Sequence, residues 1–241
     1  MINVIGVFDS GIGGVTVLKE LLKILPNEKY IYYSDTINNP YGDKTSDEII
    51  NISDKIVKYL IDQGCTIIVI ACNTDSAIAK DYLRNKYSIP IIAIEPAYKT
   101  VPNSDKTLVM ATKATINSDK FKILFNRFDN HNTVLLSCSG LADLIEEGNK
   151  DKIIGYLDNT IGKYKGVKNV VLGCTHYPLI KNEITEVLGK VNFYDGSLGV
   201  AKHTKVVMED NNLITNTKQE ITFIDTSNNK NKEELFYKLL K

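Results

Sequence analysis

Short apolar runs rich in β-branched residues alternate along the chain with longer segments in which apolar residues recur at helical spacing. The short runs include "INVIGVF", "TIIVIA", "TLVMA" and "NVVLG", and the longer segments include residues 13–25, 45–63 and 179–189. Such alternation is typical of strand–helix units whose largely parallel sheets are covered by helices on both faces. The pattern therefore predicts an α/β fold.

The order of strand ends repeats in the two halves of the chain. In the first half one strand ends in "VFDSG" and a later one in "VIACNT", and in the second half the corresponding ends are "VMATKAT" and "VLGCTH". Chance similarity between short strand–helix turns is common, so the repeat alone leaves both readings open. If it reflects structure, two similar lobes face each other across a cleft, with Cys72 on one side and Cys174 on the other.

A lobe boundary is expected in "AIEPAYKTVPNSDK", where two prolines and several polar residues interrupt the pattern. We predict a first lobe over residues 1–96 and a second lobe over residues 97–205. Residues 206–241 then complete the first lobe, because they contain one more strand pattern and a closing helical pattern.

The charges of the chain balance, with 29 basic and 29 acidic residues. This balance argues against a nucleic acid or an anionic membrane as partner and favours a small molecule or a protein. No apolar run approaches the roughly 20 residues of a membrane span. Asp9 lies where a signal peptide would have its apolar core, so we expect a cytoplasmic protein.

The four cysteines are expected to be free thiols, since the cytoplasm keeps thiols reduced. Their spacings contain no CxxC pair, and the chain has only three histidines. We therefore expect no zinc site.

The stretch "FDSGIGG", Phe8 to Gly14, follows a predicted strand and opens a predicted helix. Its glycines permit close backbone approach, and its amides are placed to meet an anion at a helix N-terminus. It lacks both the GxGxxG and the P-loop patterns, and Asp9 would repel a phosphate. The alternative is a tight turn capped by Asp9 and Ser10.

Cys72, in "ACNTDSA", ends a strand where a helix begins. Partial positive charge at a helix N-terminus shifts a thiol toward thiolate, so Cys72 is a candidate reactive group. The alternative is an ordinary buried cysteine followed by a polar cap. We assign Cys65, seven residues earlier, to packing.

Cys174, in "VLGCTHYPLI", again ends an apolar strand. His176, two residues later, is suited to adjust the protonation of the thiol or to position a carboxylate, because histidine exchanges protons near neutrality. Pro178 fits the first turn of a helix. A core cysteine beside a surface histidine is the alternative.

The loop "NNPYGDKT" follows the strand pattern "YIYYSD". Tyr41 and Gly42 would offer a ligand an aromatic wall and a backbone amide. Most such segments are simply turns.

Two thiols at matching strand ends of two lobes have a joint chemical use. One thiol removes a proton from one face of a carbon while the other delivers a proton to the opposite face. This arrangement inverts a stereocentre, and the two groups exchange roles when the reaction runs backwards.

The motifs "FDSGIGG", "NPYGDKT", "ACNT", "TKATI" and "GCTHYPLI" occur in the order found in the glutamate racemase family, which the chain resembles from about residue 4 to 205. That family belongs to the cofactor-independent aspartate/glutamate racemase superfamily. The resemblance implies two α/β lobes with the active site between them. It also implies interconversion of L- and D-glutamate, supplying D-glutamate for peptidoglycan, with neither cofactor nor metal.

Carried over by the resemblance, Cys72 and Cys174 are the acid/base thiols, assisted by Asp9 and His176 respectively. The substrate-binding residues it implies are Asp9, Ser10, Tyr41, Gly42, Asn73, Thr74, Thr112, Thr115, Glu146, Thr175 and His176. The implied partner is a small molecule, glutamate, and members of the family often form homodimers.

Three positions depart from the family pattern: Asp75 stands where Ala is usual, Ser34 where Gly is common, and Ala111 where Gly usually precedes the threonine. Asp75 matters most. A carboxylate close to Cys72 would raise the pKa of the thiol or oppose an anionic substrate, unless it points away along the helix or complements the helix N-terminus.

Two alternative functions follow from the same residues. One is a sibling activity: racemisation of aspartate or hydantoins, or decarboxylation with one cysteine. The histidine of "GCTHYP" favours glutamate, because aspartate-specific relatives usually carry an acidic residue there. The other is a two-lobed protein that binds a small anion without chemistry, which would need neither thiol.

Overall fold

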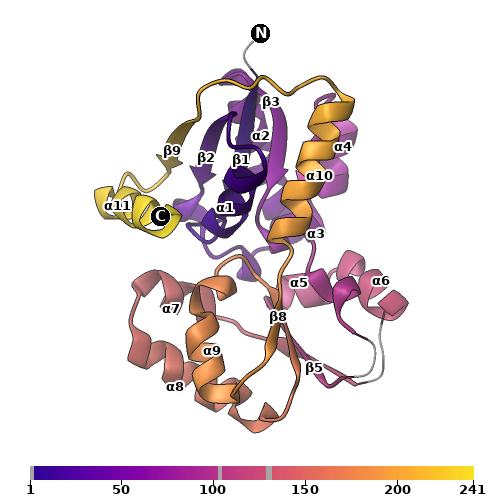
Figure 1. Cartoon of the computed structure of the whole chain (residues 1–241), viewed down its shortest axis with the longest axis vertical. Helices are drawn as coiled ribbons and strands as arrows, with labels where there is room; N and C mark the ends of the chain where they lie inside the picture. Colours follow the sequence, from indigo (N-terminus) through magenta and orange to yellow (C-terminus); the bar gives the residue numbers. More distant parts are fainter. Residues whose placement is uncertain (1–2, 103–104, 129–131) are drawn as a thin grey trace.

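The computed structural model describes residues 3–102, 105–128 and 132–241. They form two lobes stacked along the long axis of the molecule (Figure 1). Each lobe is a parallel sheet flanked by helices, so the α/β prediction is confirmed. Among the described helices, none is long and apolar enough to cross a membrane.

The first lobe contains a five-stranded sheet with strand order β4-β3-β1-β2-β9. Its strands are β1 Val4–Asp9, β2 Lys29–Ser34, β3 Cys65–Ile70, β4 Ile91–Ala93 and β9 Glu220–Asp225. Its helices are α1 Val15–Ile24, α2 Ser46–Asp62, α3 Asn73–Ile78, α4 Lys80–Lys86, α10 Ser197–Asp210 and α11 Lys230–Leu240.

The second lobe contains a four-stranded sheet with strand order β6-β5-β7-β8. Its strands are β5 Thr107–Ala111, β6 Thr133–Ser137, β7 Asn169–Gly173 and β8 Asn192–Tyr194. Its helices are α5 Lys113–Asn117, α6 Asp119–Phe128, α7 Leu141–Glu147, α8 Lys150–Ile161 and α9 Lys181–Leu188. Short 3₁₀ helices at Thr36–Asn38, Tyr41–Asp43, Ala97–Thr100, Gly162–Tyr164 and Tyr177–Ile180 complete the described elements.

Both sheets are covered on both faces, which explains their continuous apolar runs. In β3, Ile67 and Val69 pack into the core formed with α1, α10 and α11, whereas Ile68 and Ile70 pack into the core formed with α2 and α4. Successive side chains of a strand point to opposite faces, so a strand buried on both sides must be apolar at nearly every position.

The chain returns to the first lobe earlier than the expected residue 205. That residue lies inside α10, whose Val200, Ala201 and Met208 are buried in the first-lobe core. We therefore place the return between β8 and α10. A Cβ at Gly196 would collide with the carbonyl oxygen of Glu95, so the outgoing and returning segments touch there, and only glycine fits.

Candidate active site

The carboxyl ends of strands from both sheets meet at one pocket between the lobes. β1 ends at Asp9 and β3 leads into Cys72, while β5 leads into Thr112 and β7 into Cys174. Parallel strands share one carboxyl edge, where the following loops are free to carry functional groups. The predicted stretches of the two halves therefore converge on one site.

Most of the predicted site residues line this pocket. They are Ser10, Tyr41, Gly42, Cys72, Asn73, Thr74, Thr112, Cys174, Thr175 and His176. Three others, Asp9, Thr115 and Glu146, lie behind the lining, where each contacts a residue that does line it.

Cys72 occupies the N-cap position of the short helix α3, with its Sγ 3.8 Å from Ser10 Oγ. Burial raises the pKa of Cys72 well above that of a free thiol, and negative charge on Asp9 or Asp75 raises it further. The backbone N–H of Asp75 acts in the opposite direction. Burial thus opposes the expected shift of Cys72 toward thiolate, and the N–H of Asp75 at the start of α3 favours it.

Cys174 lies beside His176, whose Nδ1 is 3.7 Å from its Sγ. The imidazole is almost fully buried. Burial disfavours the charged ring, but hydrogen bonds with Cys174 and Glu146 outweigh it and raise the pKa of His176 well above its usual value. The raised pKa favours the charged ring beside the thiol, and the alternative of a surface histidine is wrong because the side chain is buried.

Glu146 joins three parts of the site. Its Oε1 lies 2.8 Å from Nε2 of His176 and accepts a hydrogen bond from the backbone N–H of Ile12 at 3.2 Å. Its Oε2 pairs with Nζ of Lys232. Burial alone would raise the pKa of Glu146, but its contacts with His176 and Lys232 lower it to about 2.

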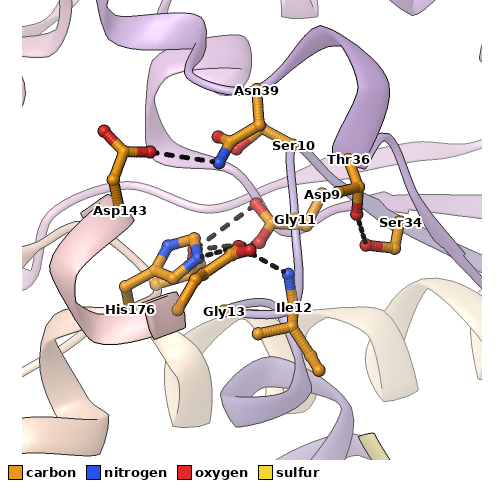
Figure 2. A network of polar contacts seen from close by, with 12 residues as sticks. Asp9, Ser10, Gly11, Ile12, Gly13, Ser34, Thr36, Asn39, Asp143 and His176 are labelled. Carbon is orange, nitrogen blue, oxygen red and sulfur yellow. Dashed lines mark hydrogen bonds and ion pairs between the residues drawn. The ribbon is translucent and has the colours of Figure 1, made fainter. Parts of the chain in front are cut away.

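Two glycines of the loop "FDSGIGG", Gly11 and Gly13, leave room for side chains of the second lobe. A Cβ at Gly13 would lie 2.5 Å from Nδ1 of His176, and one at Gly11 would collide with Glu146. Figure 2 shows the His176 ring lying against this loop. The backbone amides of this loop were expected to bind an anion. Two of them instead donate to carboxylates of the protein itself: Ile12 N–H to Glu146, and Gly14 N–H to Asp9 at 2.7 Å.

Asp9 is fully buried, and burial raises its pKa. It accepts hydrogen bonds from the N–H of Gly14 and, at 3.1 Å, from the hydroxyl of Thr175 in the other lobe. In the described part of the chain no hydrogen bond joins Asp9 to Cys72. Asp9 acts on Cys72 only through its charge.

Three threonine hydroxyls meet across the lobe interface. Thr74 Oγ1 lies 2.9 Å from that of Thr112 and 3.2 Å from that of Thr115, and the latter two are 2.9 Å apart. Thr112 also caps α5 by accepting a hydrogen bond from the N–H of Thr115. The cluster fixes the hydroxyl-bearing strand ends of both lobes beside the pocket.

The loop after β2 forms another wall. Tyr41 lines the pocket and is buried, and its hydroxyl donates a hydrogen bond to Asp35 at 2.6 Å. The Asn39–Pro40 peptide bond is cis. Figure 2 shows Asn39 facing Asp143 of α7, with 3.5 Å between Nδ2 and Oδ1.

Several contributors were not predicted from the sequence. Pocket-lining residues of this kind include Asn39, Cys138, Ser139 and Asp143. Cys138 follows β6 in "LLSCSG", a strand end of the same kind as the predicted ones, so a signal was present. Lys232 gave no such signal, because it belongs to a polar helix near the end of the chain. Within the described ranges no three His, Cys, Asp or Glu side chains converge as metal ligands would.

Two thiols at the strand ends of two parallel α/β lobes, facing one pocket, are the arrangement that the sequence associates with racemases. The model of the Asp/Glu/Hydantoin racemase family matches residues 28–203. The chain belongs to this family.

Curated glutamate racemases are among the relatives of the chain. The glutamate racemase of Clostridium perfringens is 42% identical over 226 residues, covering 90% of this chain and 87% of the relative. Glutamate racemase 2 of Bacillus subtilis is 40% identical over 235 residues, covering 92% and 88%. The resemblance to glutamate racemases is thereby confirmed.

Solved structures agree. The glutamate racemase of Francisella tularensis in complex with D-glutamate is similar with a TM-score of 0.86 and 35% identity, covering 99% of this chain and 94% of that one. The glutamate racemase of Thermus thermophilus in complex with β-chloro-D-alanine is similar with a TM-score of 0.85 and 30% identity, covering 100% and 94%.

Proposed function

We propose that this protein interconverts L- and D-glutamate by moving a proton on each face of the α-carbon. The observation that carries the proposal is the placement of Cys72 and Cys174, one from each lobe, in the lining of a single pocket. They are close enough for charge on Cys174 to raise the pKa of Cys72. The glutamate racemases among the relatives support glutamate as the substrate.

In the proposed reaction one cysteine thiolate takes the α-proton, and the electrons of the broken C–H bond remain on the α-carbon and its carboxylate. The opposite thiol then gives its proton to the other face and becomes a thiolate. In the reverse direction the two sulfurs exchange roles. The imidazolium of His176, 3.7 Å from Cys174 Sγ, stabilises negative charge on that sulfur.

Negative charge that develops on the substrate carboxylate needs preorganised donors, because no electron sink delocalises it. The proposed donors are the lining groups Ser10, Asn73, Thr74, Thr112 and Thr175. Asp9, Thr115 and Glu146 are assigned to hold these groups and His176 in place, since each contacts one of them from behind.

We also propose that the reaction takes place in the cytoplasm, where both thiols stay reduced, and supplies D-glutamate for peptidoglycan. A homodimer is the proposed assembly. Sedimentation of the purified protein at several concentrations tests the assembly separately from the chemistry.

Solvent exchange tests the proposed reaction. When L- or D-glutamate is incubated with the protein in deuterated buffer, the α-proton signal should vanish from the NMR spectrum while circular dichroism shows loss of optical activity. Retention of that signal with folded protein overturns the proposal. Aspartate and a hydantoin, assayed in parallel, test the sibling activities, and binding of glutamate without exchange would identify the non-catalytic binding protein.

A further inference from the structure

Asp75 is a fully buried carboxyl group in the first turn of α3, three residues after Cys72. It does not line the pocket and does not point outward along the helix. Its Oδ2 instead lies 2.9 Å from the hydroxyl oxygen of Ser53, on α2. The side chain that departs from the family pattern is therefore enclosed between two helices.

The contacts of Ser53 bear on the protonation state of Asp75. Ser53 Oγ lies 2.6 Å from the carbonyl oxygen of Ile49 and 2.9 Å from Oδ2 of Asp75. A hydroxyl has one hydrogen, and a carbonyl oxygen has none. Unless the single hydroxyl hydrogen is shared between the two acceptors, both short contacts are hydrogen bonds only if Ser53 donates to Ile49 and Asp75 carries a proton that it donates to Ser53.

The surroundings of Asp75 agree with this accounting. Its Oδ1 is buried and has no hydrogen-bond partner, and no basic side chain in the described ranges pairs with it. An ionised carboxylate in such a place would be strongly disfavoured. Burial, together with the charges of Asp9 at the end of β1 and Asp35 after β2, raises the pKa of Asp75 to about 8, and a hydrogen bond donated by Ser53 would only lower it.

The same group acts on its titratable neighbours. Negative charge on Asp75 raises the pKa of Cys72 at the start of α3 and that of Tyr41 in the loop after β2. The backbone N–H of Asp75, in contrast, hydrogen-bonds to Cys72 and lowers the pKa of its thiol. A neutral Asp75 keeps the favourable N–H without the opposing charge.

We propose that Asp75 is a neutral carboxylic acid in the active protein, and that this neutrality allows Cys72 to carry the negative charge that proton abstraction requires. The inference rests on the proposed role of Cys72 as a base. Asp75 is then a positioning residue that acts through Cys72, and its ionisation above about pH 8 weakens that half of the site.

The pH dependence of stability tests the protonation of Asp75 without any assay of activity. An unfolded Asp titrates near pH 3.9, so between about pH 4 and 8 the folded protein binds one proton more than the unfolded chain. This group therefore contributes stability at low pH that is lost as the pH rises to about 8. Between these pH values, the titration of Asp75 alone multiplies the equilibrium constant of unfolding by about ten for each pH unit.

Asp75→Asn removes this proton while keeping the shape and a donor for Ser53. The ratio of the unfolding constants of the unsubstituted protein and the variant should therefore rise about tenfold per pH unit from pH 5 to 7.5 in denaturant titrations. The exposed Asp158, on α8, gives the matched control Asp158→Asn, which should show no such slope. A flat ratio for Asp75→Asn overturns the proposal.

Ser53→Ala identifies the donor. The pH-dependent slope ends at the pKa of Asp75 in the folded protein. If Asp75 donates to Ser53, this variant removes a hydrogen bond from the neutral form only, and that pKa falls. If Ser53 instead donates to an ionised Asp75, the variant removes a hydrogen bond from the charged form, and the pKa of Asp75 rises. An upward shift or no shift overturns the assignment of Asp75 as the donor to Ser53, whereas the slope itself judges whether Asp75 is neutral.

The pH profile of glutamate racemisation tests the consequence for Cys72. The ratio of activity at pH 9 to activity at pH 7 should be severalfold higher in Asp75→Asn than in the unsubstituted protein, because the variant acquires no charge beside the thiol. An unchanged ratio overturns the link to Cys72. Absence of α-proton exchange in the unsubstituted protein would instead overturn the proposed function, and the stability measurements would still judge the protonation of Asp75.

Discussion

Lys232, in the C-terminal helix of the first lobe, forms an ion pair with Glu146, on α7 of the second lobe. The other oxygen of the same carboxylate contacts Nε2 of His176. Both partners of the ion pair are largely buried. The closing helix of the chain is therefore linked through one carboxylate to the imidazole beside Cys174.

Lys232→Met should lower kcat/KM for glutamate by about tenfold or more, since hydrogen bonds to charged groups are worth about 1.5–3 kcal/mol. The variant frees one oxygen of Glu146 and loosens its hold on His176. Enantiomers have equal free energies, so kcat/KM must fall by the same factor in both directions, whereas kcat and KM taken separately are free to differ. Lys238→Met, on the exposed side of the same helix, should retain full activity. Equal behaviour of the two variants contradicts the prediction.

Glu146→Gln should lower the pKa of His176, because the carboxylate helps to raise it. Proton NMR of the imidazole across a pH series measures the shift. An unshifted His176 resonance would show that Glu146 does not control the ring.

Glu146 should also make the protein less stable as the pH falls below 4.5. The pKa of Glu146 is lowered to about 2 from 4.5, so its contribution is present above pH 4.5 and is lost as the pH falls toward 2. At 1.36 kcal/mol per pKa unit the loss is about 3 kcal/mol. Denaturant titrations of the unsubstituted protein and Glu146→Gln should therefore converge toward pH 2. Curves that stay parallel below pH 4.5 contradict this assignment.

Cys72→Ser and Cys174→Ser should each abolish inversion in both directions, with losses of at least the 10²–10⁴-fold typical of general acid–base catalysis. A serine hydroxyl does not ionise near neutrality and so cannot replace the thiolate. Optical rotation of L- and D-glutamate measures the rates. Cys65→Ser is the control, because Cys65 is buried at the start of β3 and does not line the pocket. Activity retained in either variant would indicate one-base chemistry.

Gly13→Ala should reduce activity by about a hundredfold, because its Cβ would lie 2.5 Å from Nδ1 of His176 and displace the ring. The overpacking should cost about 1–3 kcal/mol of stability, measured by denaturant titration. Gly155→Ala, in α8, is the control: its Cβ meets nothing, and the change should stabilise the protein by about 0.5–1 kcal/mol. Full activity of Gly13→Ala would show that the loop has room for the ring to move.

The sequence by itself determined the α/β class, the repeat of strand ends and the two cysteines that the pocket brings together. These features depend on local patterns: the spacing of apolar residues, and the step from an apolar strand to a polar helix start at Cys72 and Cys174. The return of the chain to the first lobe was predicted about nine residues too late, because an apolar helix pattern does not say which of two cores buries it.

Only the tertiary structure decided which groups surround those cysteines. Asp9, Glu146 and Asp75 each contact a residue far away along the chain: Thr175, Lys232 and Ser53, at separations of 166, 86 and 22 residues. Contacts at such separations depend on how lobes and helices pack, and packing also sets the burial that raises the pKa of Cys72 and Asp75. The sequence placed the reactive side chains at strand ends, and the approach of the two lobes set their charges.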